Sequence, residues 1–206
     1  MTAEQEKAFI AFVRNDETYQ KYYDEMIILL GTGLRISELC GLTDADLDFE
    51  NRIITVNHQL LYLSDRGYYI SEPKTKSGYR QIVMSEKVRQ AFLRVLARRK
   101  TSHFAIDGYK GFIFLKQNGE PKNSSCYVSV FKGLRKKYHK QCDIELPKKM
   151  TAHTLRHTFC TNMANAGINP KALQYIMGHA SITMTLNYYA HATFESAKAE
   201  MKRLVA

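Results

Sequence analysis

The sequence has few prolines and glycines and no long apolar run. Its four prolines and eleven glycines among 206 residues exclude a collagen-like or linker-rich chain. The apolar runs, such as Met26 to Leu30, fall far below the roughly 18 residues that span a bilayer. The segment MTAEQEKAFI has acidic residues where a signal peptide has basic ones, so we expect no export.

Cysteine is also scarce. The four cysteines are Cys40, Cys126, Cys142 and Cys160. They form no CxxC pair and no dense disulfide pattern, which excludes the common zinc and redox motifs, and we expect them to be reduced.

The residues that are abundant predict a folded, basic domain. Hydrophobic residues make up 45% of the chain and aromatic residues 11%, which is enough to bury a core. Thirty Lys and Arg against 20 Asp and Glu give a net charge of +10, which favours a polyanionic partner such as nucleic acid. Charge alone does not choose between DNA, RNA and an acidic membrane surface. No internal repeat or linker divides the chain, so we treat residues 1–206 as one domain.

Hydrophobic periodicity predicts a mostly helical α+β fold. Thr2 and Gln5 resemble a capping box before the first helix, and Gly31 and Gly33 are expected to end the second. Further helices are expected at 34–42, 85–99, 124–140, 153–165, 170–177, 181–189 and 193–204. Strands at 53–56, 67–70 and 80–84 are expected to form a small antiparallel sheet, with an isolated strand at 112–115.

Three separated segments hold polar residues that packing does not explain. They are GTGLRISEL with Arg35, TAHTLRHTF with His153, Arg156 and His157, and MGHASITMTLNYYAH with His179, Tyr188, Tyr189 and His191. His153 and Arg156 are three residues apart and share one helix face, whereas His157 is expected to point elsewhere as a buried structural partner. Arginine fits two phosphate oxygens, and imidazole exchanges a proton near neutral pH. These segments therefore favour phosphate chemistry.

The three segments resemble the characteristic boxes of the tyrosine recombinases, or phage-type integrases, in their catalytic domain. GTGLRISELCGL is similar to the first arginine box, HTLRHTFCT to the His-x-x-Arg-His box, and MGHASITMTLNYYAHA to the Gly-His box with the nucleophilic tyrosine. The resemblance runs from about residue 1 to residue 204. Within the family it is greatest to integrases of conjugative transposons.

The resemblance implies an enzyme that cuts and rejoins DNA through a covalent 3′-phosphotyrosine, without metal, cofactor or ATP, in transposon or phage integration and excision. Arg35 and Arg156 would clamp the scissile phosphate beside His153 and His179. Lys74, in the turn of PKTKSGYR, would protonate the leaving 5′ oxygen, with Lys76 as its rival. Tyr189 is expected to be the nucleophile because Tyr189-Ala190-His191 matches the family's Tyr-x-His ending; Tyr188 is the alternative.

The resemblance also implies partners. Double-stranded DNA is the expected substrate, bound by a homotetramer in the bacterial cytoplasm, with an accessory DNA-bending or directionality protein and no membrane. The segment 193–204 is expected to couple subunits, and the N-terminal DNA-binding domains of the family are expected to be absent from this chain. Lys76 is also expected to contact DNA. Arg135, Lys136 and Lys137, in RKKYHK, either contact DNA phosphates or form a solvated helix face.

Three other interpretations remain open at this stage. His153 and His157 form an H-x3-H pair that could bind zinc, although no HExxH glutamate follows the first histidine. A type IB topoisomerase-like enzyme would use nearly the same residues to relax DNA. A non-catalytic basic DNA-binding module would need the charge but not the polar set.

Overall fold

The computed structural model describes residues 1–73, 75–189 and 201. The helices are α1 (Ala3–Asn15), α2 (Tyr23–Thr32), α3 (Ile36–Gly41), α4 (Glu86–Arg98), α5 (Ser124–Gln141), α6 (Ala152–Asn165), α7 (Pro170–Met177) and α8 (Ile182–Leu186). The strands are β1 (Leu47–Asp48), β2 (Ile53–Val56), β3 (Gln59–Leu63), β4 (Gly67–Ser71) and β5 (Arg80–Val83). The expected mostly helical α+β fold is confirmed. The expected helix at 193–204 lies outside the described residues apart from Met201.

Local capping signals place the helix starts correctly. The Gln5 amide donates to Thr2 Oγ1 at 3.1 Å, and the Thr2 amide donates to Gln5 Oε1 at 2.9 Å, which confirms the capping box. Ser85 caps α4 through the Val88 amide. These side chains satisfy amides that have no partner within the helix, so the signal is readable from the sequence.

The sheet differs from the expectation of one three-stranded antiparallel sheet. Strands β1, β2 and β5 form one sheet, and β3 pairs with β4 in a separate hairpin. The 67–70 segment pairs with the unpredicted strand Gln59–Leu63, because a short turn after Leu63 makes the two segments adjacent antiparallel neighbours.

The expected strand at 112–115 is also wrong. Phe112 and Leu115 each form only an isolated bridge, to Thr43 and Pro121. Phe112, Ile113 and Phe114 are buried, so their apolar character reflects the core rather than a strand.

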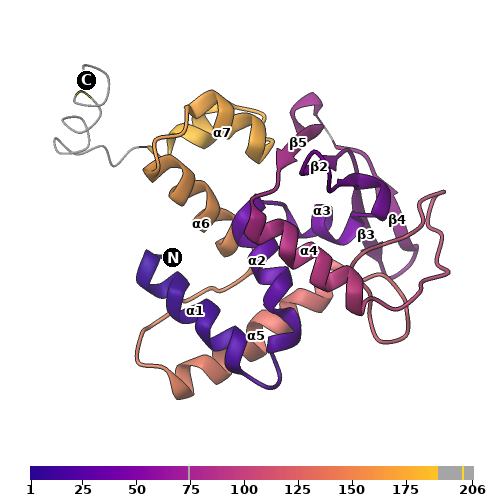
Figure 1. Cartoon of the computed structure of the whole chain (residues 1–206), viewed down its shortest axis with the longest axis horizontal. Coiled ribbons are helices and arrows are strands. Elements are labelled where there is room, and N and C mark those ends of the chain that lie inside the picture. The colour runs from indigo at the N-terminus through magenta and orange to yellow at the C-terminus, as the bar shows by residue number, and fades with distance from the viewer. Residues whose placement is uncertain (74, 190–200, 202–206) are drawn as a thin grey trace.

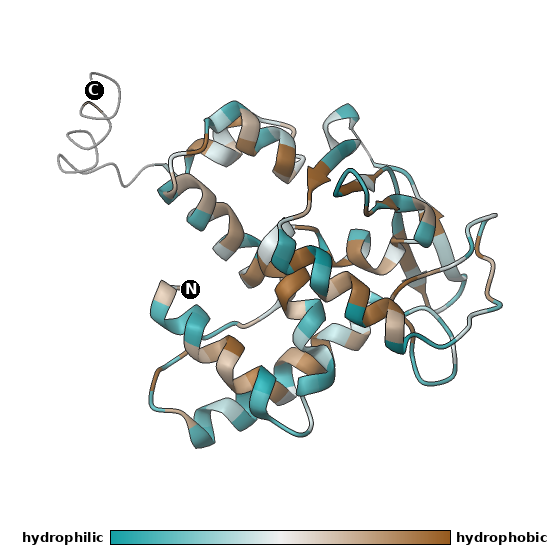
Figure 2. Cartoon of the chain, viewed as in Figure 1, coloured by the Kyte–Doolittle hydropathy of each residue, from teal (hydrophilic) through white to brown (hydrophobic). Residues whose placement is uncertain are grey.

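Helix α2 lies at the centre of the molecule. It packs against α1, α4 and α6, and in Figure 1 it lies between α6 and α7 on one side and the strands on the other. Met26, Ile28 and Leu29 have no exposed surface, so the apolar run Met26 to Leu30 belongs to the core. The outer helices α1 and α4 alternate hydrophobic and hydrophilic residues, as Figure 2 shows. No helix in the described part of the chain is long and apolar enough to cross a membrane.

Gly33 ends α2 and turns the chain toward the polar cluster described below. Its φ of 65° is left-handed, and its amide donates to the Leu29 carbonyl. A Cβ at this position would lie 2.4 Å from Cδ1 of Phe159 and 3.0 Å from Sδ of Met177. Glycine is therefore required here both by the backbone and by the close approach of α6.

We expect Gly33→Ala to lower the free energy of unfolding by about 3 kcal/mol, since it adds an overpacking cost to the strain of a left-handed alanine. Gly67→Ala is the matched control, because Gly67 has φ 79° but a Cβ there would meet no atom within 4 Å, and it should cost only about 1 kcal/mol. Urea unfolding measures both values. Equal losses would show that the contact with Phe159 is unimportant.

Candidate active site

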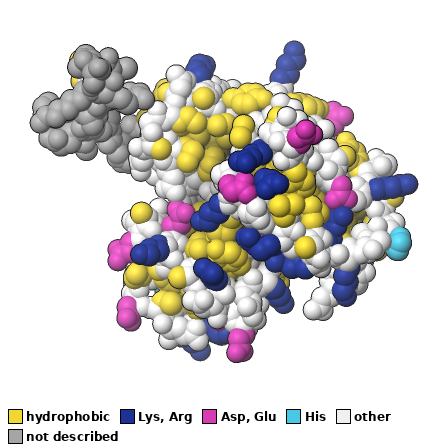
Figure 3. All heavy atoms as spheres, viewed as in Figure 1, with side chains coloured by type: hydrophobic (Ala, Val, Ile, Leu, Met, Phe, Trp, Pro, Cys, Tyr) yellow, Lys and Arg dark blue, Asp and Glu magenta, His cyan; other side chains and the backbone are white. Residues whose placement is uncertain are grey.

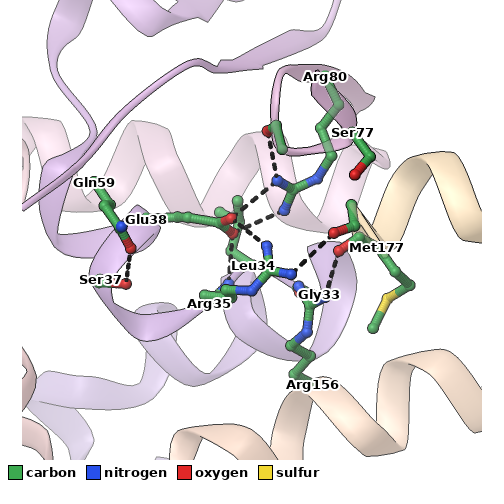
Figure 4. A network of polar contacts seen from close by, with 12 residues as sticks. Gly33, Leu34, Arg35, Ser37, Glu38, Gln59, Ser77, Arg80, Arg156 and Met177 are labelled. Carbon is green, nitrogen blue, oxygen red and sulfur yellow. Dashed lines mark hydrogen bonds and ion pairs between the residues drawn. The ribbon is translucent and has the colours of Figure 1, made fainter. Parts of the chain in front are cut away.

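Three arginines from distant parts of the chain meet beside the end of α7. Arg35 immediately precedes α3, Arg80 opens β5, and Arg156 lies in the first half of α6. Figure 4 shows their guanidinium groups directed toward one region around Glu38 and the α7 terminus. The expected pairing of Arg35 with Arg156 in one site is consistent with this arrangement, and Arg80 is an addition that the sequence analysis missed.

Glu38 is shared by two of these arginines. Arg35 Nη1 donates to Glu38 Oε1 at 2.7 Å, and Arg80 donates to both oxygens at 2.9 and 2.7 Å. Burial alone would raise the pKa of Glu38, but the hydrogen bond from Arg80 and the charges of Arg80 and Arg35 lower it to about 2. Glu38 is therefore ionised at neutral pH.

Three consecutive carbonyls at the end of α7 each accept from a different arginine. Arg80 Nε donates to the Ile176 carbonyl at 2.7 Å, and Arg156 Nη2 donates to the Met177 carbonyl. Arg35 Nη2 donates to the Gly178 carbonyl at 2.9 Å. The last carbonyls of a helix lack partners within it and carry partial negative charge, so cationic donors stabilise them.

Arg156 is almost completely enclosed. It is 4% exposed, and its Nη1 also donates to the Gly33 carbonyl at 2.5 Å, which ties α6 to the end of α2. Burial, followed by the charge of Arg35, lowers its pKa to about 10, so the group stays cationic at neutral pH. Its two bonds occupy two of the five guanidinium N–H groups.

His179 lies next to the arginines, directly after Gly178. It is 5% exposed, and its Nδ1 is 3.0 Å from Thr185 Oγ1. Burial and the charges of Arg156, Arg35 and Arg80 lower its pKa to about 4. The imidazole is therefore neutral near pH 7 and suited to hydrogen bonding or proton transfer.

The position of His157 differs from the prediction. His157 is exposed rather than buried, and its Nε2 is 2.7 Å from Nε2 of His153, because residues four apart on a helix share a face. Its Nδ1 contacts the hydroxyl of Tyr188. Burial and neighbouring cationic groups lower the pKa of both histidines. Neither has an HExxH glutamate, and no group of three or more metal-ligating residues occurs within residues 1–73 and 75–189.

The two candidate tyrosines have different surroundings. The ring of Tyr188 stacks on His179 with centroids 6.5 Å apart, and its hydroxyl reaches His157. The Tyr189 hydroxyl donates instead to the Ile168 carbonyl at 2.6 Å. Burial raises the pKa of both phenols, so both are protonated at neutral pH. The structure thus brings Tyr188, and not Tyr189, to the histidines.

The predicted basic residues are dispersed. Lys74 lies outside the described residues. Lys76 is exposed in a short 3-10 helix, Lys76–Gly78, beside a cleft of about 280 Å³ that Arg35, Thr75 and Gly178 help to line.

Residues 135–137 lie on α5. Lys137 pairs with Asp16 at 2.6 Å, Lys136 is exposed, and Arg135 is half-buried. Figure 3 shows other Lys and Arg side chains gathered over α4. The DNA contacts expected for Lys76 and for residues 135–137 stay predictions.

The fold and the arginine–histidine cluster define a protein of the phage-integrase type. Residues 1–196 match the model of the phage integrase family, and the chain belongs to this family, the tyrosine recombinases.

The chain is 62% identical over 205 residues to the transposase from transposon Tn916 of Enterococcus faecalis, covering 99% of this chain and 50% of that protein. It is 29% identical over 205 residues to the tyrosine recombinase XerA of Pyrococcus furiosus, covering 98% of this chain and 60% of that protein. The chain spans about half the length of the Tn916 relative.

Solved structures of integrases and recombinases are also similar to this chain. The integrase of transposon Tn1549, in complex with circular intermediate DNA, has a TM-score of 0.92 and 62% identity, covering 99% of this chain and 65% of that one. A crystal structure of XerA recombinase has a TM-score of 0.70 and 25% identity, covering 98% and 64%. The resemblance to conjugative-transposon integrases stated from the sequence is therefore confirmed.

The low pKa of His179 predicts a pH-dependent stability. Between about pH 6.5 and 4 the unfolded chain binds a proton at His179 that the folded chain does not, so stability falls as the pH falls through this range. We expect this residue to contribute a loss on the order of 2 kcal/mol. Urea unfolding of wild type and His179→Gln at pH 7 and pH 4.5 measures it. An identical pH dependence in the two proteins would contradict the placement of His179 beside the arginines.

Proposed function

We propose that this chain is the catalytic part of a site-specific recombinase that cleaves and rejoins DNA in transposon integration and excision, through a covalent 3′-phosphotyrosine. The observation that carries the proposal is the convergence of Arg35, Arg156 and His179 on one partly open site. Family membership and the 62% identity to transposon integrases support it.

The site has the electrostatics that phosphoryl transfer needs. Arg35 is 39% exposed at its side chain, and its two bonds leave further N–H groups for a phosphate oxygen. As a tyrosine oxygen attacks phosphorus and the bond to the 5′ oxygen breaks, charge gathers on the non-bridging oxygens. Fixed guanidinium groups stabilise that charge without reorganising.

The reaction needs one proton acceptor and one proton donor. The phenol must lose its proton as it attacks, and the neutral imidazoles of His153 and His179 are candidate acceptors. The departing 5′ oxygen must gain a proton, which we assign to Lys74. The product is a tyrosyl phosphodiester, which a 5′ hydroxyl can attack to rejoin DNA without ATP.

Tyr189 is the proposed nucleophile. Two solved structures of the Tn1549 integrase carry substitutions of an arginine by lysine and of a tyrosine by phenylalanine at positions 154 residues apart. Arg35 and Tyr189 are also 154 residues apart, whereas Tyr188 is one residue nearer. Tyr189 must therefore give up its bond to the Ile168 carbonyl before it attacks, and Tyr188 must yield its place beside the histidines.

We expect wild-type protein to form a covalent adduct with a nicked duplex that copies the right-end DNA of transposon Tn1549, in the presence of EDTA. Tyr189→Phe should abolish the adduct because it lacks the attacking oxygen, and Tyr188→Phe, the matched control, should retain it within about tenfold. Denaturing gels measure the adduct.

The reverse pattern would move the nucleophile to Tyr188. A wild-type protein that forms no adduct on either right-end or circular-intermediate DNA would overturn the proposed function. Relaxation of supercoiled plasmid without strand exchange would identify a topoisomerase instead.

We further propose that the enzyme acts on double-stranded DNA in the bacterial cytoplasm as a homotetramer, with an accessory DNA-bending or directionality protein. The basic charge of +10 supports the DNA partner. The segment 193–204 has Phe194, Ala197, Met201 and Leu204 at helical spacing, which would suit packing on a neighbouring subunit.

Deletion of residues 193–206 should therefore lower strand exchange and tetramer formation on DNA by at least about tenfold while leaving the fold intact. Gel filtration with the DNA, strand-exchange assays and circular dichroism measure the three properties. Unchanged assembly and exchange would contradict a role for this segment in coupling subunits.

A further inference from the structure

Arg80 is a fully enclosed charged side chain near the site. Its side chain has no exposed surface, so it cannot contact DNA in this conformation. It donates to both oxygens of Glu38, to the Ile176 carbonyl and, at 3.1 Å, to the Gly78 carbonyl. A buried guanidinium is costly unless its donors find partners, and these four bonds use four of its five N–H groups.

These bonds join three segments that are far apart in the chain. Arg80 opens β5, with Gly78 two residues before it, Glu38 lies in α3, and Ile176 lies in the last turn of α7. Gly178 fits closely against this group, since a Cβ there would lie 3.0 Å from Nη1 of Arg80. The end of α7 therefore rests directly on the Arg80 side chain.

The carboxylate of Glu38 links Arg80 to Arg35. Glu38 Oε1 accepts from Arg80 Nη1 at 2.9 Å and from Arg35 Nη1 at 2.7 Å. Glu38 Oε2 accepts from the Arg35 amide and from Arg80 Nη2, both at 2.7 Å. Because Arg80 holds both oxygens, the carboxylate cannot rotate, and the Arg35 guanidinium has a fixed partner on its inner side.

We propose that Arg80 is a positioning residue: acting through Glu38, it fixes the Arg35 guanidinium where it meets the scissile phosphate and holds the α7 terminus beside it. The inference rests on the proposed function. Without the fork of Arg80, Glu38 keeps only Arg35 as a charged partner, and the Arg35 guanidinium is drawn inward, away from the substrate.

The decisive variant is Arg80→Lys, which keeps the positive charge but loses the planar fork. Its matched control is Arg94→Lys, because Arg94 also pairs with a buried carboxylate, Asp24, at 2.7 Å, and neither residue touches the arginine cluster. Circular dichroism and thermal melting establish that each variant is folded.

We expect Arg80→Lys to bind the nicked right-end duplex within about threefold of wild type but to form the adduct about 100-fold more slowly in a single turnover, since a misplacement of about 1 Å costs that much. Arg94→Lys should cleave like wild type. In an Arg35→Lys background, Arg80→Lys should slow cleavage by less than about threefold more, because both changes remove the same alignment.

A second substrate separates positioning from general loosening of the fold. In a duplex with a methylphosphonate at the scissile position, one charged oxygen is replaced by a methyl group, and the demand for an aligned Arg35 falls. Arg80→Lys should then cleave within about threefold of wild type. A purely structural defect would slow both substrates equally.

The outcomes are distinguishable. If wild type forms no adduct, the proposed function fails, and the Arg35 Nε–H signal in the NMR spectrum still tests the inference, which predicts that Arg80→Lys shifts it and Arg94→Lys does not. If wild type cleaves and folded Arg80→Lys cleaves the phosphodiester equally fast, or loses the same factor on both substrates, the positioning role is overturned.

Discussion

A single buried carboxylate, Glu38, organises the polar centre of this protein. It binds two arginines at once, and burial strengthens those contacts because little water competes for them. Through Arg80 and Arg35 it connects α3 to β5 and to the end of α7. A buried ion pair of this kind adds little net stability compared with apolar packing, but it defines one geometry and penalises others.

The second constraint is the C-terminus of α7, where three carbonyls accept from three arginines. These bonds span long distances in the sequence: 143 residues from Arg35 to Gly178 and 96 residues from Arg80 to Ile176. The arrangement places His179, which directly follows the helix, next to the guanidinium groups, and the Tyr188 ring stacks on His179. The helix end thus neutralises part of the cationic cluster and positions His179 beside it.

Burial and the arginine cluster together set the protonation states of the histidines. Burial, followed by the charges of neighbouring cationic groups, lowers the pKa of His179 and of the two histidines of α6, so the imidazoles are neutral near pH 7. The phenols stay protonated. The site thus combines permanently charged guanidinium groups with imidazoles that are neutral near pH 7, because the two residue types differ in pKa.

Much of the fold and site followed from the sequence, because the signals are local. Thr2, Ser85 and Asn169 cap helices a few residues away, and the three polar boxes identified the family and the residues Arg35, Arg156 and His179. Glu38 was not predicted, although its position three residues after Arg35 is the spacing of an i,i+3 ion pair and could have been recognised in the sequence. The β3–β4 hairpin, the exposure of His157 and the pairing of Tyr189 with Ile168 depended on the tertiary structure. So did Arg80, whose partner lies 42 residues away: nothing near Arg80 in the sequence distinguishes it from a surface arginine, and only chain folding brings Glu38 and the α7 carbonyls within hydrogen-bonding distance.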